Sequence, residues 1–285
     1  MNVIAGSGAP ADPHDGAPAD PGDGAPADRH DGAAANPNDR APADPHDGAQ
    51  ADPGDGAPAD LGAAMARLLL NAGAVAFSRE HPFILAAGWA SPVYVDCRLL
   101  IGEPAVRRDV TLLAAAKLRR SFGAALPFDA IAGAETAGIP WACWLADRLN
   151  LNLRYVRKRA LGIGQNAQVE GGPVDGQRVL LVDDLTTDGG SKAAFTRGLR
   201  AAGALVSDAL SLFFHGTFPG AAERLAALNL NLHALATWRD VLAVGQAGTL
   251  SEEDHAELER FVADPVGWSA AHGGRTTPIV SSLQF

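Results

Sequence analysis

Residues 178–192, RVLLVDDLTTDGGSK, constrain the fold more than any other stretch of the chain. After one arginine come four successive apolar residues, a pattern typical of a parallel strand covered on both faces. Asp183 and Asp184 follow, at the strand end where open α/β sheets place their ligands. Residues 187–191 are small or polar and lead into a helix-compatible segment, so their backbone N–H groups can converge on an anion. We therefore predict an α/β protein with a phosphate-binding turn here; a plain helix-capping turn is the alternative.

Helical and strand patterns alternate along the chain, which predicts right-handed βαβ units and a central parallel sheet flanked by helices. The segment 104–120 illustrates the helical pattern, because Pro begins it and an apolar stripe follows. The predicted helices span residues 61–77, 104–120, 139–149, 190–202 and 252–262. The predicted strands span residues 128–132, 154–157, 179–182, 204–214 and 232–237.

An octapeptide of the type GAPADPHD recurs seven times between residues 8 and 63. No large apolar side chain occurs from residue 5 to residue 60, so burial would not offset the entropy of ordering. A solenoid is the competing interpretation, but its coils need an apolar stacking position that this repeat lacks. We expect residues 1–60 to be a disordered tail and residues 61–285 to be the folded part.

Charge and apolar runs exclude several classes of protein. The tail holds twelve Asp and two Arg, a net charge of −10 that equals the formal charge of the whole chain. The basic and acidic residues of the remaining 225 residues are therefore equal in number. The folded part thus lacks the excess of positive charge that a nucleic-acid-binding surface needs. No run of eighteen apolar residues and no signal-like segment occurs, so we expect no membrane contact. Cys97 and Cys143 lack metal-ligand spacing, and free thiols favour a cytoplasmic protein.

Two further segments resemble ligand-binding turns. Residues 132–140, AGAETAGIP, repeat the order of strand, Gly/Thr turn and helix, so a second set of donors would face the same crevice; Thr136 as a plain helix cap is the alternative. Residues 154–172, RYVRKRALGIGQNAQVEGG, carry four cations and four glycines without a helical or strand period. Cations and Gly hinges suit a lid that closes on a polyanion, with a solvated basic loop as the alternative.

Together these motifs resemble those of orotate phosphoribosyltransferases, which belong to the type I phosphoribosyltransferases. FILAAGWASPVYVDCR at 83–98 resembles the family's SG..SP.Y.D.R segment, and GAETAGIP resembles its diphosphate-binding turn. YVRK with the following glycines and EGG resembles the flexible catalytic loop, and LLVDDLTTDGGS resembles the loop that binds phosphoribosyl pyrophosphate (PRPP). The resemblance implies a type I fold with a flexible lid and a small hood, divided into residues 61–103 (hood part), 104–230 (core) and 231–285 (C-terminal extension).

The resemblance implies transfer of the 5-phosphoribosyl group of PRPP to N1 of orotate, giving orotidine 5′-phosphate and diphosphate in UMP synthesis. It implies Mg²⁺ held mainly through the diphosphate, with no protein metal site, and a homodimer in which Arg157 reaches the neighbouring site. The implied catalytic residues are Arg157, Lys158, Arg159, Asp183 and Asp184. The implied PRPP-binding residues are Thr136, Ala137, Arg157, Lys158, Asp183, Asp184, Leu185, Thr186, Thr187, Asp188, Gly189, Gly190 and Ser191. The implied orotate-binding residues are Tyr94, Val95 and Thr187.

Four positions depart from the family pattern. Ala86 and Ala137 stand where relatives commonly carry Lys, and Leu161 and Ile163 replace a Lys and a His of the lid. Loss of one preorganised charge typically costs ~2.7–4 kcal/mol of transition-state stabilisation, and Arg159 is the candidate substitute for the lid lysine. The family's arginine for the orotate carboxylate has no match near Phe213, Phe214 and His215. Two alternatives remain. The chain could be a catalytically weak relative that binds PRPP or a nucleotide and has a regulatory or partner-subunit role, or a phosphoribosyltransferase for another base.

Overall fold

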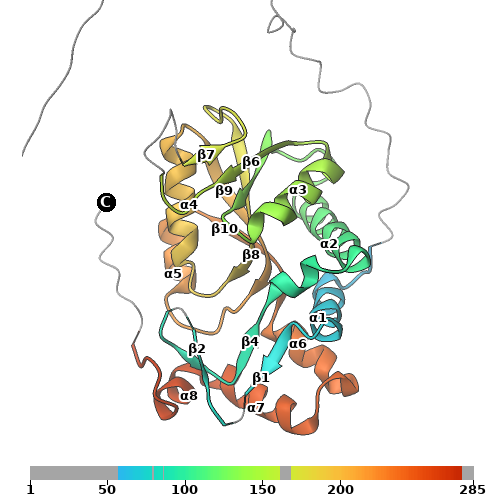
Figure 1. Ribbon diagram of the computed structural model, residues 1–285, viewed down its shortest axis with the longest axis vertical. Coiled ribbons are helices and arrows are strands. Elements are labelled where there is room, and N and C mark those ends of the chain that lie inside the picture. Colours follow the sequence, from blue (N-terminus) through green and yellow to red (C-terminus); the bar gives the residue numbers. More distant parts are fainter. Residues whose placement is uncertain (1–56, 79, 86, 161–167, 278–285) are drawn as a thin grey trace, which may run out of the picture. The chain divides into compact units, whose positions relative to one another are not determined.

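The computed structural model describes residues 57–78, 80–85, 87–160 and 168–277. The predicted tail lies outside these residues except for its last four. Ala86, Leu161 and Ile163 also lie outside them, as does the central part of the predicted lid, residues 161–167. The described part forms a six-stranded sheet with helices on both faces (Figure 1).

The sheet has the strand order β10-β9-β8-β5-β6-β7. Five strands are parallel, as predicted, and β7 pairs with β6 in the antiparallel direction at one edge. The pair Ala132↔Leu181 places two apolar residues side by side at the centre, where both strands are buried. The strands are β5 Ala130–Ala134, β6 Asn152–Val156, β7 Val169–Glu170, β8 Arg178–Thr186, β9 Leu205–Phe214 and β10 Asn231–Thr237.

Successive residues of β8 face two separate apolar cores, because side chains alternate along a strand. Leu180 and Val182 belong to the larger core, under the helices α1 to α3 and α6 (Figure 1). Val179 and Leu181 belong to the smaller core, under α4 and α5. The helices are α1 Leu61–Asn71, α2 Pro104–Phe122, α3 Gly138–Leu149, α4 Gly190–Ala201, α5 Ala221–Ala227, α6 Trp238–Val244, α7 Glu252–Ala263 and α8 Pro265–Ala271.

Two small antiparallel strand pairs lie beside the C-terminal helices. β1 (Val75–Phe77) pairs with β4 (Val93–Val95), and β2 (Phe83–Ile84) pairs with β3 (Ala90–Ser91). The backbone N–H of Ala90 donates to Oγ of Ser269 at 3.0 Å, and that of Arg275 donates to the carbonyl of Gly88 at 2.8 Å. Trp89 stacks on Phe218 with ring centroids 4.8 Å apart. Residues 88–90 are therefore fixed against a segment almost two hundred residues later, and we call the two strand pairs together with this segment the hood.

Several element boundaries differ from the predicted ones. The helix predicted at 61–77 ends at Asn71, because Gly73 turns the chain with φ +65° and residues 75–77 pair as β1. The strands predicted at 128–132 and 154–157 lie at Ala130–Ala134 and Asn152–Val156, where their mutual pairing places them. β8 continues past the predicted end to Thr186, because pairing with β9 extends that far. Helices α5, α6 and α8 and strand β7 were not predicted.

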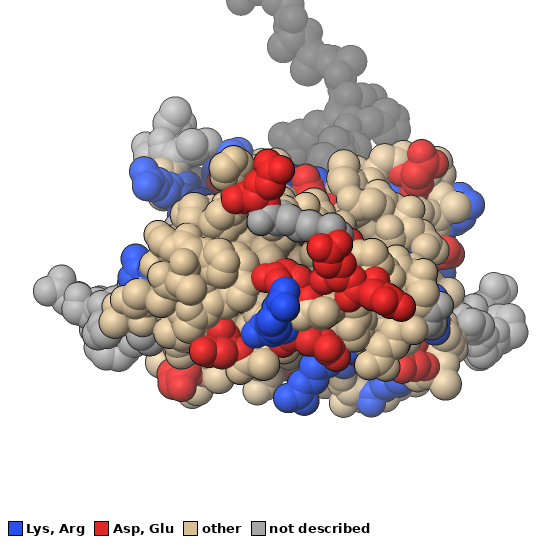
Figure 2. All heavy atoms as spheres, turned by 90° about the horizontal axis from the view of Figure 1, so that it is seen from below, with Lys and Arg blue, Asp and Glu red and all other residues tan. Residues whose placement is uncertain are grey.

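Acidic side chains gather at the end of the molecule where α7 and α8 lie (Figure 2). The first turn of α7 alone carries Glu252, Glu253 and Asp254, which suits the positive end of a helix dipole. None of the helices in the described ranges is long and apolar enough to span a membrane.

Two glycines allow α3 to lie directly on the strands that precede the central turns. A Cβ on Gly133 would meet Cα of Ile139 at 2.7 Å, and a Cβ on Gly138 would meet the carbonyl oxygen of Val182 at 2.4 Å and Cα of Asp183 at 3.0 Å. These neighbours are backbone atoms, which cannot swing aside. The start of α3 thus sets the distance between the β5 turn and the acidic end of β8.

We expect Gly138→Ala to destabilise the fold by about 1–3 kcal/mol, the usual effect of forcing a methyl group into a packed site. Thermal unfolding followed by circular dichroism measures the change. Gly102→Ala is the matched control, because its Cβ would meet its nearest neighbour, the carbonyl oxygen of Leu99, at 3.6 Å. Equal melting temperatures for the two variants would contradict the close approach.

Candidate functional site

A cavity of about 620 Å³ opens at the carboxyl ends of β5 and β8. Its size is typical of small-molecule sites, and it lies where parallel sheets bind ligands. Four connections form its wall: the β4 end with the following turn Cys97–Ile101 (η1), the β5–α3 turn, the start of the β6–β7 connection, and the β8–α4 turn. The three segments predicted to bind one ligand therefore meet, together with the SPVYVDCR segment.

The β8–α4 turn supplies the longest part of the wall. The predicted residues that line the cavity are Asp183, Asp184, Leu185, Thr187, Asp188, Gly190 and Ser191. Thr186 points elsewhere, since its hydroxyl is 2.6 Å from that of Ser211 beneath the sheet edge. Gly189 has φ +76° and faces Leu225, so it shapes the turn from behind. The N-terminus of the twelve-residue helix α4, which is the positive end of its dipole, lies at the cavity.

A buried lysine holds the first of the two acids of β8. The side chain of Lys192 is fully buried, and its Nζ lies 2.5 Å from Oδ2 of Asp183 and 3.0 Å from the carbonyl oxygen of Leu185. Oδ1 of Asp183 accepts the backbone N–H of Asp184 at 3.0 Å. Both oxygens of Asp183 therefore have internal partners, and its carboxylate is fixed at the edge of the cavity.

Asp184 is the more exposed of the two acids, and its pKa is shifted. Burial, followed by the neighbouring charge of Asp183, raises the pKa of Asp184 to about 7. Raised pKa values of this kind concentrate at sites where a ligand supplies the missing partners. A ligand that donates hydrogen bonds or brings a cation would stabilise the carboxylate of Asp184.

The β5–α3 turn contributes Glu135, Thr136 and Ala137 to the wall. The helix-cap alternative for Thr136 is wrong, because Ala137 occupies the N-cap of α3 and no side chain caps this helix. Thr136 is exposed instead, and it follows Glu135 through a cis peptide bond.

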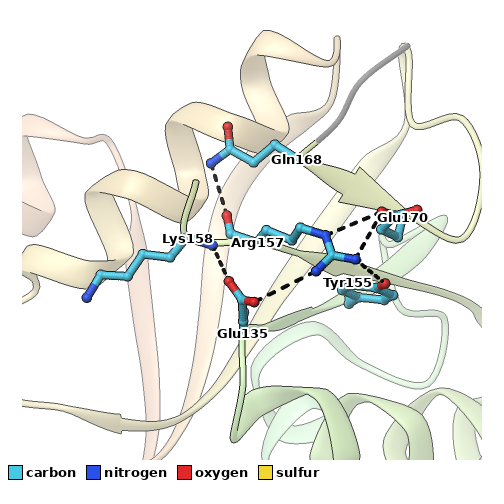
Figure 3. A network of polar contacts seen from close by, with 6 residues as sticks. All are labelled: Glu135, Tyr155, Arg157, Lys158, Gln168 and Glu170. Carbon is cyan, nitrogen blue, oxygen red and sulfur yellow. Dashed lines mark hydrogen bonds and ion pairs between the residues drawn. The ribbon is translucent and has the colours of Figure 1, made fainter. Parts of the chain in front are cut away.

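Glu135 joins this turn to the start of the predicted lid (Figure 3). Its Oε2 accepts the backbone N–H of Lys158 at 2.8 Å, and its Oε1 lies 3.9 Å from Nη1 of Arg157. Arg157 also donates to Glu170 at 3.2 Å and to the Tyr155 hydroxyl at 3.0 Å. The guanidinium of Arg157 is thus held on the rim by two carboxylates.

The three predicted lid cations occupy different places. Lys158 lines the cavity, and its side chain extends away from the Arg157 contacts (Figure 3). Arg157 and Arg159 do not line it, and Arg159 is exposed. The structure therefore brings one of these three cations directly to the site.

The β4 end and η1 form another part of the wall. Tyr94 and Val95, both predicted, line the cavity with Asp96, Cys97 and Arg98. The Tyr94 ring packs against Phe83 at 5.6 Å between centroids. Nε of Arg98 donates to Oδ1 of Asp96 at 2.6 Å, and Nη2 donates to Oδ2 at 2.9 Å. An aromatic ring and a cation thus stand side by side on this wall.

Three residues in or beside the cavity were not among the predicted site residues: Glu135, Arg98 and Lys192. Lys192 carried a detectable signal, because it shares one helical face with Phe195, Thr196 and Leu199, all buried. Glu135 and Arg98 lay within quoted motifs but needed the fold to reveal their partners. The described residues contain no group of three or more His, Cys, Asp or Glu that could hold a metal ion by itself.

Comparisons with known proteins agree with this geometry. Residues 103–215 match the model of the phosphoribosyl transferase domain. The chain is 47% identical over 211 residues to an orotate phosphoribosyltransferase of Rhizobium rhizogenes, covering 74% of this chain and 90% of that one. It is 48% identical over 214 residues to the one from Allorhizobium ampelinum, covering 75% and 93%.

A solved structure extends the agreement to three dimensions. The orotate phosphoribosyltransferase from Aeropyrum pernix aligns with a TM-score of 0.52 and 37% identity, covering 65% of this chain and 98% of that one. Identity at this level over nearly whole relatives, together with the shared sheet and turns, means that the chain belongs to the orotate phosphoribosyltransferase family.

Proposed function

We propose that the chain transfers the 5-phosphoribosyl group of PRPP to orotate, giving orotidine 5′-phosphate and diphosphate for UMP synthesis. One observation carries this proposal: four separate motifs of the family line a single cavity at the carboxyl ends of β5 and β8. In the reaction, N1 of orotate gives up its proton to solvent and bonds to C1 of the ribose, while the C1–O bond breaks and its electrons leave with diphosphate. A cytoplasmic location accords with this role.

We assign the ribose and its 5′-phosphate to the β8–α4 turn. Asp184, with a raised pKa and partial exposure, would accept hydrogen bonds from ribose hydroxyls, and Asp183 would do so from its fixed position. The turn from Thr187 to Ser191 at the start of α4 would hold the phosphate through backbone N–H groups and the helix dipole. Thr186 and Gly189 support this turn from behind rather than from the cavity wall.

We assign the diphosphate to the opposite rim, where Thr136, Ala137 and Lys158 line the cavity. Catalysis here consists of positioning and of neutralising the charge that develops on the leaving diphosphate. Lys158 supplies one charge, and its backbone is fixed by Glu135. Arg157 and Arg159 begin outside the wall, so each would have to move to reach the diphosphate.

Mg²⁺ fits this site as a partner of the bound substrate. Asp184 offers a hard oxygen ligand whose raised pKa shows that its negative charge lacks full compensation. The ion would lie mainly on the diphosphate, with Asp184 close to the ribose hydroxyls. When bound, it supplies positive charge to the departing group.

We further propose a homodimer in which Arg157 serves the neighbouring site. The position of Arg157 on the rim, outside the wall of its own cavity, supports this arrangement. Mixing Arg157→Ala chains with chains lacking a functional Asp184 would restore activity if the two sites share residues. Sedimentation as a monomer would contradict the dimer.

Loss of orotate absorbance in the presence of PRPP and Mg²⁺ tests the proposed function. Turnover that depends on both substrates is expected. Intact PRPP binding by calorimetry without turnover would indicate a non-catalytic relative. Turnover with another base alone would replace orotate as the substrate.

Asp184→Asn should weaken PRPP binding about 10- to 100-fold, because a neutral amide replaces a charged acceptor. In the wild type, Asp184 becomes charged as the pH rises through about 7, so PRPP affinity should increase between pH 6 and pH 8. Calorimetry at both pH values should show this increase in the wild type and a smaller one in Asp184→Asn. Identical pH profiles would contradict the assignment.

The same substitution should stabilise the ligand-free protein at pH 8. The folded-state pKa of Asp184 lies above 3.8, the ordinary value for an aspartate, so its contribution to the free energy of unfolding becomes less favourable as the pH rises from about 4 to about 7. Removing the charge should raise the melting temperature by about 2–4 °C, the shift for about 1 kcal/mol in a domain of this size. No such gain is expected at pH 4, where the carboxyl is protonated in the fold.

Lys192→Met should lower the melting temperature by about 6–20 °C, because it leaves Asp183 buried without its cation at a cost of about 3–5 kcal/mol. The double variant with Asp183→Leu removes both charges and should recover part of that loss. Differential scanning calorimetry measures both. A double variant less stable than Lys192→Met would contradict the pairing.

A further inference from the structure

We propose that Arg98 binds the carboxylate of orotate and thereby selects orotate over pyrimidines that lack this group. The inference deepens the proposed function and rests on it. Arg98 stands at the start of η1, lines the cavity, and leaves 60% of its side chain accessible.

The guanidinium is oriented before any ligand arrives. Asp96 accepts from Nε at 2.6 Å and from Nη2 at 2.9 Å, and the Tyr94 hydroxyl lies 3.5 Å from Nη2. Nη1 makes no hydrogen bond to any residue in the described ranges. A planar cation fixed on one edge with donors left on the other is suited to a carboxylate, which guanidinium groups bind in a forked geometry.

The connectivity of the product places the carboxylate near Arg98. In orotate the carboxyl group is bonded to the carbon next to N1, and N1 bonds to C1 of the ribose. The carboxylate must therefore lie beside the ribose, whose hydroxyls we assign to Asp184. Arg98 and Asp184 line the same cavity, so a carboxylate beside the ribose lies in the space that Arg98 borders.

The end of β9 offers no cation for this task within the described chain. Phe213 is fully buried, and Nδ1 of His215 accepts from Nε1 of Trp238 at 3.1 Å. Burial lowers the pKa of His215 to about 4, so its ring is neutral at pH 7.

Among the described residues of the cavity wall, the cations are Arg98 and Lys158. Lys158 belongs to the rim beside Glu135, where the diphosphate is assigned. Arg98 is therefore the cation on the side of Tyr94, where the family resemblance would place the pyrimidine.

Steady-state kinetics of Arg98→Gln with each substrate varied in turn test this assignment. The KM for orotate should rise about 10- to 100-fold, the loss expected for a hydrogen bond to a charged group, while the KM for PRPP changes less than about twofold. Uracil lacks the carboxylate, so its inhibition constant as a competitor of orotate should be the same in the wild type and in Arg98→Gln. Arg98→Lys should recover part of the orotate affinity because it keeps the charge.

Two control variants distinguish the loss of a carboxylate contact from a general structural effect of the substitution. Asp96→Asn weakens the ion pair that orients the guanidinium but keeps the cation, so most of the discrimination between orotate and uracil should persist. Arg275→Gln removes another hood arginine, one that packs against Gly88 outside the cavity wall, and should also keep it.

Three results would overturn the inference. The first is an equal loss of orotate and uracil binding in Arg98→Gln, and the second is a rise confined to the KM for PRPP. The third is loss of discrimination in Arg275→Gln with none in Arg98→Gln. Absence of orotate turnover in the wild type would instead overturn the proposed function, so the two failures are distinguishable.

Discussion

The ion pair between Lys192 and Asp183 is the contact on which the site depends. It joins the end of β8 to the first turn of α4 across nine residues, in a place from which water is excluded. A buried pair stabilises a fold little compared with apolar packing, but it penalises any arrangement that separates its members. The turn between them, which carries the proposed phosphate site, is therefore fixed at both ends. Asp184, next along the strand, is left with a charge that the protein alone satisfies poorly.

Asp184 and Gly138 show two ways in which the site is built at some expense of stability. The raised pKa of Asp184 means that the empty site holds an unfavourable charge at pH 8, which substrate and metal would relieve. The missing side chain at Gly138 gives up helix propensity so that α3 can approach β8. Both features exist because ligand groups must come close to backbone atoms and acids at one sheet edge.

The core and the central turns were predictable because their signals are local. Four apolar residues before two acids indicate a buried strand and its ligand-binding end, and the alternation of elements fixes a mostly parallel sheet. The end of β8 was not predictable, since only pairing with β9 carries it on to Thr186. The antiparallel β7 has two residues, too few for a period. The partners of Arg98 and Glu135 depend on contacts between segments that the sequence does not show to be neighbours, and the lid positions Leu161 and Ile163 lie outside the described residues.

The contacts of the hood affect the order in which parts of the protein can fold. Ala90 and Gly88 are bonded to Ser269 and Arg275, so these hood contacts form only after residues 269–275 have been synthesised. The sheet, whose last strand ends at Thr237, can form earlier from contacts closer in sequence. The sheet and the turns at its edge would then be assembled first, and the hood would be completed last.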